Sequence, residues 1–278
     1  MVRATSHAIC DLCDRHALIP HPEDDTFNRT ELGLVDHVLT IPLWIWVVVM
    51  PADRHHRVMG SFGSSVNPDS SAKPPPRVAS RVAWSTVPLV VRGVGRAVWR
   101  LEVDRGPGFP DPPFILAANH HSFLDPLMVG AVFGRPTRFI ALVDLFGNHR
   151  WLDYALGVFD VIPVRRGVVP LGAVRAAIHH LEDGGVVSLF PEGTRHWDFD
   201  PSRSLPGAAW LAARSGVPLV PVAIRGTERV LGVDNKLRSG RIRVEVGPSM
   251  SATGRDRSSI DDLTRRWGSW IVRSLGQG

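Results

Sequence analysis

The sequence predicts an α/β fold, with a mainly parallel central sheet flanked by helices and with an N-terminal extension. Three observations lead to this prediction. Short apolar runs of strand length alternate with amphipathic segments of helical period from about residue 83 onward. Two of these runs, 114–118 and 185–190, end in polar, charged loops, as strands do where an α/β fold supports a site. The 278 residues are 44% apolar and 21% charged, so a sizeable core can form.

The first expected element of the folded part is a helix over 84–103. Its arginines, Arg92, Arg96 and Arg100, recur at a spacing of four and therefore share one face. A basic amphipathic helix can lie on an anionic membrane surface. It can equally pack on its own domain and leave the arginines in solvent, and the sequence leaves both interpretations open.

Strands and helices then alternate along the chain. The expected strands occupy 114–118, 137–143, 157–164, 185–190, 218–224 and 241–246. Pro126 suits the first turn of a helix that follows the first of these strands. Further helices are expected over 169–183, 206–215 and 259–275. The second of these ends at Gly216, and the third has Ser258 or Ser259 as its N-cap.

The N-terminal part of the chain has a different composition. We predict an extension over 1–59 that is membrane-associated or poorly ordered, a flexible linker rich in Ser, Gly and Pro over 60–82, and one compact domain over 83–278. The apolar run 38–50 is interrupted by Pro42 and is shorter than the about 20 residues of a spanning helix. It is expected either to enter a membrane interface or to fill a core.

Charge and cysteine content narrow the class of protein. The net charge of +5 and the pI near 10.1 suit partners that carry phosphate. No aromatic-basic platform or DNA-reading motif accompanies this charge, so we expect no nucleic acid partner. Two cysteines, Cys10 and Cys13, cannot form a disulfide framework, and the first 36 residues do not resemble a signal peptide. Their spacing from His7 and His16 is too cramped for a zinc finger, and we predict no metal site.

Two polar loops hold the most informative residues. The first, 119–125, places His120 five residues before Asp125, and an imidazole oriented by a carboxylate can take a proton from a hydroxyl. The second, 190–195, places Glu192, Gly193 and Arg195 directly after an apolar run. Arginine's planar fork matches phosphate oxygens, so this second loop is a candidate phosphate site.

Two further blocks accompany these loops. Arg165 and Arg166 end the apolar run 157–164 and offer another phosphate contact. The apolar stretch 216–222 contains two prolines and is expected either to line a groove for a hydrocarbon chain or to be a plain core strand.

Taken together, the four blocks resemble the glycerolipid acyltransferase family, whose best-known members are 1-acyl-sn-glycerol-3-phosphate acyltransferases. That family carries, in fixed order, an Asn-His-x4-Asp block, an arginine block, a Pro-Glu-Gly-Thr-Arg block and an apolar block with prolines. In this chain the blocks stand at 119–125, 157–166, 190–195 and 217–222. The likeness covers roughly residues 85–250, and the first 80 residues lie outside it.

The resemblance implies roles for the matching residues. His120 would be the general base that takes the proton from the acceptor hydroxyl as the hydroxyl attacks a thioester. Asp125 would hold the imidazole in the right tautomer, as in a Ser-His-Asp triad without the enzyme nucleophile. The implied substrate-binding residues are Arg166, Glu192, Gly193, Thr194 and Arg195. The neighbouring His121 is expected to point away and is given no role.

The resemblance also implies the partners. A fatty acyl group would move from acyl-CoA or acyl carrier protein, as co-substrate, to the hydroxyl of a lysophosphatidate-like glycerolipid, with no other cofactor and no metal. The protein would work at a membrane surface on the cytoplasmic face, and the sequence does not indicate its oligomeric state.

Two departures from the family pattern leave the acceptor open. Arg165 stands where an aspartate is common in the family, and His196 stands where a serine is common. The alternatives are an acyltransferase or transacylase for another lysophospholipid or lipid alcohol, and a non-catalytic lipid-binding membrane protein of the same fold. Retention of all four central residues argues against the non-catalytic alternative; these are His120, Asp125, Glu192 and Arg195.

Overall fold

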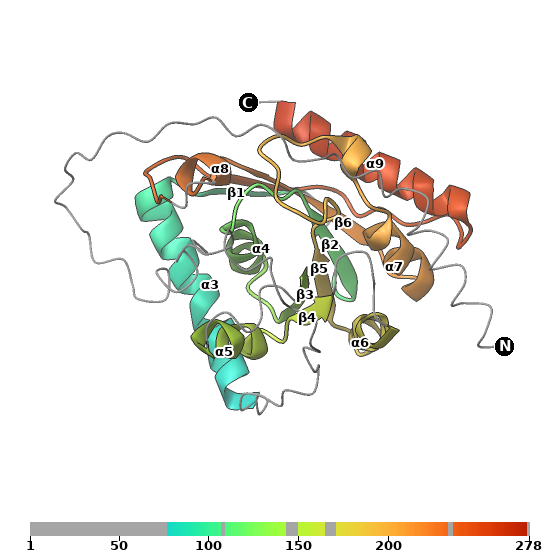
Figure 1. Ribbon diagram of the computed structural model, residues 1–278, viewed down its shortest axis with the longest axis horizontal. Helices are drawn as coiled ribbons and strands as arrows, with labels where there is room; N and C mark the ends of the chain where they lie inside the picture. The colour runs from blue at the N-terminus through green and yellow to red at the C-terminus, as the bar shows by residue number, and fades with distance from the viewer. Residues whose placement is uncertain (1–76, 107–108, 143–149, 165–170, 233–235, 277–278) are drawn as a thin grey trace, which may run out of the picture.

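The computed structural model describes residues 77–106, 109–142, 150–164, 171–232 and 236–276 (Figure 1). In that part of the chain, seven strands form one sheet in the order β1-β7-β6-β2-β5-β3-β4. Their bounds are β1 Glu102–Arg105, β2 Phe114–Ala118, β3 Thr137–Leu142, β4 Ile162–Val164, β5 Val186–Leu189, β6 Leu219–Arg225 and β7 Arg243–Val246. Neighbouring strands run parallel except β6 and β7. The predicted mainly parallel α/β fold is therefore confirmed.

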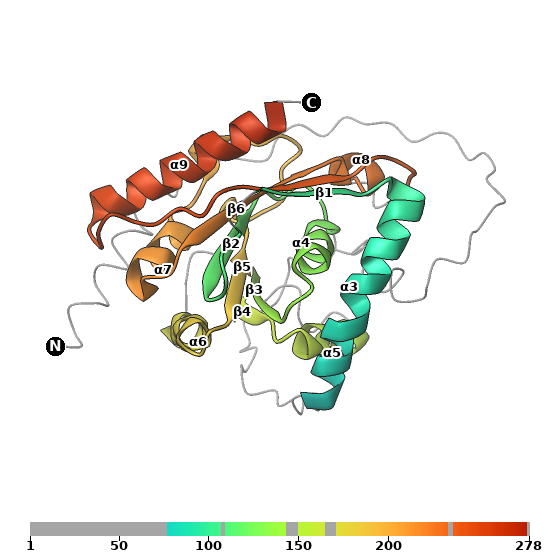
Figure 2. The same ribbon diagram turned by 180° about the vertical axis from the view of Figure 1, so that it is seen from behind.

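Helices cover both faces of the sheet (Figures 1 and 2). Their bounds are α3 Arg77–Trp99, α4 Asp125–Phe133, α5 Arg150–Val158, α6 Leu171–Glu182, α7 Gly207–Ser215, α8 Thr227–Val230 and α9 Arg257–Gly276. In the central strand β2, Phe114, Leu116 and Ala118 belong to the hydrophobic cluster with α3 and α4. Ile115 and Ala117 belong to the cluster with α6, α7 and α9. The alternation of side chains along one strand thus supplies two cores.

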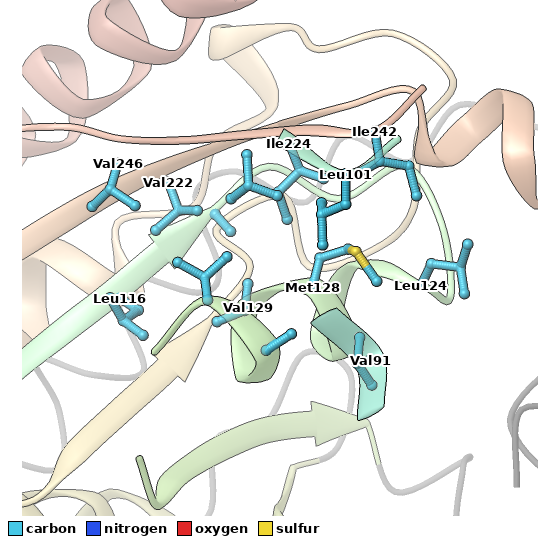
Figure 3. Packing of buried hydrophobic residues seen from close by; sticks show 14 of the residues in the cluster. Val91, Leu101, Leu116, Leu124, Met128, Val129, Val222, Ile224, Ile242 and Val246 are labelled. Atoms are coloured by element: carbon cyan, nitrogen blue, oxygen red, sulfur yellow. The ribbon is translucent and has the colours of Figure 1, made fainter. Parts of the chain in front are cut away.

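Helix α3 packs on α4 through a regular inner face. Trp84, Pro88, Val91 and Trp99 recur at spacings of three, four and eight residues, which places them on one side of the helix, and all are buried. Figure 3 shows Val91 of α3 next to Met128 of α4, both in the same buried cluster. Full burial of a side chain of this size stabilises a fold by about 1.5–3 kcal/mol, so this seam fixes α4 against the sheet.

Helix α9 covers the opposite face. Leu263, Trp267 and Ile271 are almost fully buried there, at the spacing of one helical face. The indole Nε1 of Trp267 donates a hydrogen bond to the main-chain oxygen of Ala117, 2.9 Å away. This contact joins the last helix to the central strand one residue before its end.

Several expected elements are confirmed with small shifts in their bounds. β2 spans 114–118 as predicted, and Pro126 lies in the first turn of α4. α7 ends at Gly216, whose positive φ of 74° forms a left-handed C-cap. The expected N-cap of the last helix is wrong, because α9 begins at Arg257 and the side chain of Asp256 accepts the main-chain N–H of Ser259 at 3.0 Å.

The first predicted helix is displaced along the chain. α3 begins at Arg77, so residues 77–82, which we assigned to the linker, are part of this helix. It ends at Trp99, and the expected final residues of the helix instead form β1, which pairs with β7. Pairing with a strand far along the sequence is a tertiary effect that overrides local helical periodicity.

The strand predicted over 157–164 is only partly correct. Its last three residues form β4, whereas Gly157 and Val158 end α5, a helix that the sequence analysis missed. A short, largely apolar segment has no clear period that distinguishes a buried strand from the end of a buried helix.

The described residues contain no helix that is both long and apolar enough to span a bilayer. The predicted extension 1–59, its apolar run 38–50, and linker residues 60–76 lie outside the described residues, so their predictions stay untested.

Candidate active site

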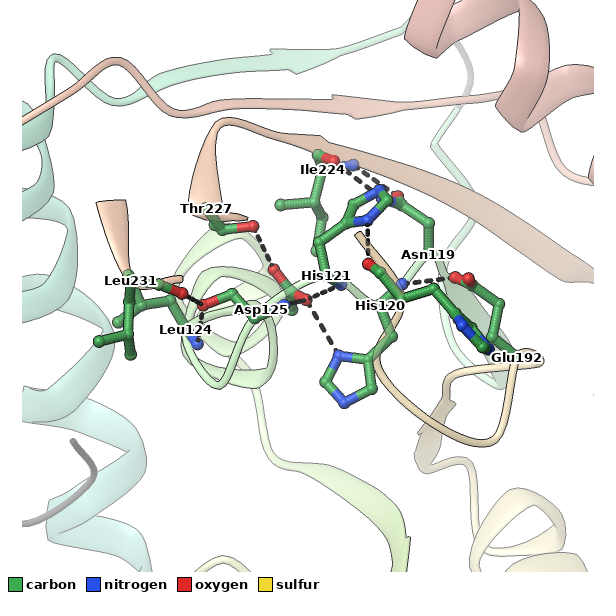
Figure 4. A network of polar contacts seen from close by, with 11 residues as sticks. Asn119, His120, His121, Leu124, Asp125, Glu192, Ile224, Thr227 and Leu231 are labelled. Carbon is green, nitrogen blue, oxygen red and sulfur yellow. Dashed lines mark hydrogen bonds and ion pairs between the residues drawn. The ribbon is translucent and has the colours of Figure 1, made fainter. Parts of the chain in front are cut away.

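Three adjacent parallel strands end at the same edge of the sheet and supply the candidate site. β2 lies between β5 and β6, and it pairs in parallel with both. The loops after these strands begin at Asn119, Phe190 and Gly226 respectively. The carboxyl ends of parallel strands are where α/β folds bind ligands, and the two polar loops singled out in the sequence meet there (Figure 4).

His120 and Asp125 form the expected pair. His120 Nδ1 lies 2.9 Å from Asp125 Oδ2, and the carboxylate is fully buried whereas 17% of the histidine side chain is exposed. An ionised carboxylate can only accept, so Nδ1 carries the proton of this bond and Nε2 is left with its lone pair. The pair is thus arranged for Nε2 to act as a base.

Three further donors hold the carboxylate of Asp125 (Figure 4). Its Oδ2 accepts the main-chain N–H groups of His121 and Ser122, each at 2.7 Å. Its Oδ1 accepts the hydroxyl of Thr227 at 2.6 Å. A buried charge is tolerated where hydrogen bonds replace water, and these donors also prevent the carboxylate from rotating away from His120.

Thr227 reaches Asp125 because of a glycine turn at the end of β6. Gly226 has a φ of 85°, and a Cβ added there would collide with the main-chain oxygen of Arg241. Only glycine fits this position without displacing β7. The chain therefore turns sharply into α8 and delivers Thr227 to the fully buried carboxylate.

The imidazole of His120 stacks on the ring of Phe190. The ring centroids are 4.1 Å apart and the planes differ by 20°. Phe190 directly follows β5, so the second loop provides one face of the environment of the base. Together, Asp125 and Phe190 fix both the direction and the plane of the imidazole.

Glu192 lies beneath this pair and is 5% exposed. Its Oε1 accepts the main-chain N–H of His120 at 2.7 Å, while its Oε2 is buried without a partner among the described residues. Burial raises the pKa of Glu192 to about 7, against the lowering effect of the His120 N–H bond. The carboxyl group thus links the two loops within the protein.

Arg195 lies over an aromatic ring of the first loop. Its guanidinium carbon is 3.4 Å from the centroid of the Phe123 ring, a cation–π contact. Desolvation lowers the pKa of Arg195 and the charge of Asp125 acts in the opposite direction, which places the guanidinium within electrostatic reach of the site. Among the described residues, no carboxylate forms an ion pair with Arg195.

Of the other predicted substrate-binding residues, the structure describes Gly193 and Thr194 but not Arg166. Gly193 adopts a φ of 68°, and its N–H donates to Phe190 O at 3.0 Å, so it makes the turn expected of it. Thr194 follows it and is half-buried. Arg166, with Arg165, lies outside the described residues, and its role stays a prediction.

Asn119 and Ser122 fasten the first loop to the rest of the fold. The side-chain amide of Asn119 donates to Ile224 O at 2.8 Å and accepts Ile224 N–H at 2.7 Å, so it clamps the end of β2 to β6. The Ser122 hydroxyl donates to Leu231 O at 2.8 Å. Both side chains are buried, and they hold the backbone on either side of the two histidines.

His121, which was expected to point away and was given no role, makes a contact with the second loop. Its Nδ1 lies 2.7 Å from the main-chain oxygen of His196, so Nδ1 must be the donor. In turn, the N–H of His196 donates to His120 O at 3.0 Å. His121 therefore joins the two loops, and this contact follows from tertiary structure that the sequence does not display.

The proline-containing apolar block is a core strand. β6 is buried along its length apart from Arg225 and lies between β2 and β7. Of the two interpretations left open for this block, the plain core strand is the one that the structure shows.

Sequence comparison finds a similarity that covers this arrangement. Residues 100–225 match the sequence model of the family described as Acyltransferase. The chain is thus similar to that family over these residues. This matched region contains both loops and Arg225, the last residue of β6, so the match and the geometric site coincide.

The curated relatives that the chain matches are named 1-acyl-sn-glycerol-3-phosphate acyltransferases. A chloroplastic protein of Brassica napus is 31% identical over 139 residues, which cover 48% of this chain and 40% of the relative. A Bacillus subtilis protein is 29% identical over 117 residues, covering 42% and 57%. A Pseudomonas aeruginosa protein is 25% identical over 195 residues, covering 68% and 72%. The chain thus spans about two fifths of the length of the first of these relatives.

A solved structure shares the fold of this chain. It is the 1-acyl-sn-glycerophosphate (LPA) acyltransferase PlsC from Thermotoga maritima, with a TM-score of 0.51 and 22% sequence identity. The alignment covers 69% of this chain and 81% of that one. At this level of identity the likeness concerns the fold.

Sequence reasoning missed Thr227, Phe190 as a stacking partner and Phe123 as the support of Arg195. The position of Thr227 carried a usable signal, because Gly226-Thr227 follows the end of a predicted strand that lies next to the first loop's strand in such a fold. The two aromatic residues had no comparable signal, because a phenylalanine beside a strand is most often core.

Proposed function

We propose that the protein transfers a fatty acyl group from acyl-CoA or acyl carrier protein to the hydroxyl of a lysophosphatidate-like glycerolipid. The observation that carries this proposal is the His120 Nδ1–Asp125 contact of 2.9 Å, which leaves Nε2 free at the carboxyl edge of the sheet. The names of the curated relatives support the same reaction.

In the proposed reaction, His120 moves one proton twice. Nε2 takes the proton of the acceptor hydroxyl while the hydroxyl oxygen attacks the thioester carbonyl carbon. The tetrahedral intermediate then collapses, the carbon–sulfur bond breaks, and the imidazolium returns the proton to the leaving sulfur. The products are an ester and a free thiol, so the protein ends the cycle unchanged.

Asp125 supports this proton transfer in two ways. It keeps the Nδ1–H tautomer, without which Nε2 would not be basic, and its charge stabilises the imidazolium that forms. The four hydrogen bonds on Asp125 keep the carboxylate in place during the reaction. This is preorganisation, because no protein dipole has to reorient when charge develops.

Arg195 is proposed to bind the phosphate of the acceptor. Its planar guanidinium can donate two parallel hydrogen bonds to phosphate oxygens, and the Phe123 ring holds its plane. Arg166 is proposed as a second phosphate contact, with Gly193 and Thr194 shaping the loop. For Glu192 we propose support of the His120 backbone, because its Oε1 is engaged there and its side chain is buried.

Membrane association is part of the proposal. Val78, Val82 and Leu89 of α3 are each more than half exposed, and their spacing places them on one face of the helix. We propose that this face rests on the membrane that contains the acceptor, on its cytoplasmic side. Protease protection of membranes from cells that produce the protein would contradict this location if the protein were shielded from a protease added on the cytoplasmic side.

The proposed reaction is tested with the purified protein and oleoyl-CoA or oleoyl carrier protein. Lysophosphatidate, other lysophospholipids and neutral lipid alcohols are offered in turn, and thiol release and product mass are measured. Thiol release that requires lysophosphatidate, and disappears in His120→Ala, is the expected result. Release without any acceptor would indicate a thioesterase, and a preference for another acceptor would correct the substrate. No transfer with either donor would contradict the proposal.

A further inference from the structure

A cavity lies away from the candidate active site, where α3 passes the C-terminus of α4. Its volume is about 400 Å³. The apolar wall is formed by Trp84, Pro88 and Leu89, and the polar wall includes Arg81 and Arg92. Because α4 begins at Asp125 and rises 1.5 Å per residue over nine residues, this cavity is on the order of 13 Å from the His120–Asp125 pair.

The polar wall of the cavity carries positive charge without a counter-charge. No carboxylate lines the cavity, and among the described residues no acidic side chain forms an ion pair with Arg81 or Arg92. The Nε of Arg92 is buried and has no hydrogen-bond partner in the described chain. A buried guanidinium N–H that lacks an acceptor loses hydration without compensation, and an anionic ligand would supply the missing acceptor.

Neighbouring arginines make this region more positive still. Arg105 donates to the main-chain oxygen of Val132, near the C-terminus of α4, where a cation is favoured. The pKa of Arg105 is lowered by desolvation and then by the charges of Arg92 and Arg135. The helix end thus accounts for Arg105, whereas Arg92 adds a repulsive charge and makes no such bond.

The mouth of the cavity is apolar on its outer side. Leu89 lines the cavity and is 65% exposed, and Val82, seven residues earlier on the same helix, is 55% exposed. Two guanidinium groups beside exposed aliphatic side chains suit an anion that carries a hydrocarbon chain better than they suit a free ion.

We propose that this cavity binds the phosphate headgroup of an anionic membrane lipid, with an acyl chain of that lipid lying along Leu89 and Val82. Arg81 and Arg92 hold the phosphate oxygens, and Trp84 and Pro88 form the wall behind them. The site is separate from acceptor binding at Arg195, and it goes beyond the proposed acyl transfer, since it selects the membrane surface and not the reacting molecule.

The test compares two pairs of charge removals, one within α3 and one at its C-terminal end, where Arg96 lies in α3 and Arg100 directly follows it. Arg81→Gln/Arg92→Gln removes the cavity arginines, and Arg96→Gln/Arg100→Gln removes two exposed arginines that do not line the cavity. Binding is measured by co-sedimentation with vesicles of phosphatidylcholine alone and of equal parts phosphatidylcholine and phosphatidylglycerol, at constant ionic strength. The expected result is that the cavity pair loses the preference for anionic vesicles at least about tenfold more than the matched pair. Equal losses would show a diffuse charge effect and overturn the proposal.

A second variant changes the cavity without changing the net charge. A Cβ at Gly134 would collide with Nη2 of Arg92, the free end of a flexible side chain, and asparagine tolerates the φ of 58° found there. Gly134→Asn is therefore expected to displace the guanidinium and to weaken binding to anionic vesicles. Binding equal to the unaltered protein would contradict the site.

Two further arms identify the ligand and keep this test independent of catalysis. Inorganic phosphate and CoA are added as competitors at matched ionic strength, and neither is expected to release the protein from anionic vesicles. Release by either one would assign the cavity to a soluble phosphate compound and overturn the lipid proposal. Because the readout is vesicle binding, it decides the matter even if the proposed acyl transfer fails, and thermal melting confirms that each variant is folded.

Discussion

The loops 119–125 and 190–196 meet at one edge of the sheet but are held in different ways. In the first loop, Asn119, Ser122 and Asp125 are buried and bond to β6 or to the segment after it. In the second loop, Glu192 is buried, but Arg195 and Gly193 are exposed. Polar contacts of this second loop run largely to the first loop itself. The first loop is therefore held by hydrogen bonds to the core of the fold, whereas the second loop is held largely by hydrogen bonds to the first loop.

The rigidly held first loop suits precise positioning of a catalytic group, and the more exposed second loop suits adaptable binding of a ligand. A base must be held within a few tenths of an ångström of its productive position, and the first loop meets that demand. An arginine that binds phosphate, as proposed for Arg195, can adapt to its ligand, and the second loop leaves Arg195 exposed. We therefore expect changes at the His120–Asp125 pair to act on kcat. Changes in the second loop, or at the His121 contact that joins it to the first loop, should act mainly on KM for the acceptor.

The largest effect is expected at the base and its carboxylate. His120→Ala and Asp125→Asn should each lower kcat by about 10³–10⁴-fold, because a neutral amide at position 125 does not enforce the Nδ1–H tautomer. Steady-state kinetics at saturating acceptor measures this. The matched control is His179→Ala, since His179 is exposed on α6 and should leave kcat unchanged. Substantial activity in His120→Ala would contradict the general-base assignment.

The next largest effect is expected on the pH dependence of the free energy of unfolding, through the carboxyl group of Glu192. Its pKa is raised from 4.5 to about 7 in the folded protein, so the folded state binds more protons than the unfolded state between these values. Stability should therefore fall as pH rises from about 4.5 to about 7 and level off above, by at most about 3 kcal/mol. Glu192→Gln keeps an acceptor for the His120 N–H and should lack this contribution. Urea unfolding of both proteins across that range measures it, and parallel curves would refute the prediction.

Substitution of Arg195 tests the proposed role of the second loop in binding the acceptor. Arg195→Gln should raise KM for a phosphate-bearing acceptor by about 10–100-fold, since a hydrogen bond to a charged group contributes about 1.5–3 kcal/mol. The value of kcat should change by only a few fold. Arg195→Lys should fall in between, because lysine keeps the charge but loses the two-pronged geometry. A loss confined to kcat would show that Arg195 serves the reaction and not acceptor binding.

Substitution of Thr227 tests how far the position of the Asp125 carboxylate depends on the segment that follows β6. Thr227→Val keeps the shape but leaves Asp125 Oδ1 without its donor, which should destabilise the fold by about 1–3 kcal/mol. It should also lower kcat, because the carboxylate is held by fewer bonds. Thr227→Ser restores the hydroxyl and should recover both quantities. Equal values for the valine and serine variants would mean that the hydroxyl is unimportant.

The smallest effect is expected at His121, which joins the loops. His121→Ala should raise KM for the acceptor by about 2–10-fold, because a neutral hydrogen bond contributes about 0.5–1.5 kcal/mol. Asparagine places an N–H close to the position of Nδ1, so His121→Asn should retain the original KM, whereas His121→Gln should not. A fall in kcat as large as that of His120→Ala would contradict the difference between the two histidines.

Local sequence predicted the elements whose signals are local. β2, α7 and the turn at Gly216 follow from apolar pattern and end signals, and the pair His120–Asp125 follows from its place after a strand. β1 was missed because it owes its conformation to pairing with β7, about 140 residues further along. The partners Thr227 and Phe190 depend on which strands become neighbours, and strand order is a property of the whole fold.

The hydrogen bond from Trp267 to Ala117 O spans 150 residues and has a consequence for the order of assembly during synthesis. Strand β2 is made before the helices that cover its Ile115–Ala117 face, and one of them, α9, follows it by about 140 residues. Until α9 is made, a nascent chain exposes the part of this apolar face that α9 covers in the folded protein. Such a surface is a target for chaperones and a starting point for aggregation. Production of this protein should accordingly be more sensitive to interference with α9 than to changes on the exposed face of α3.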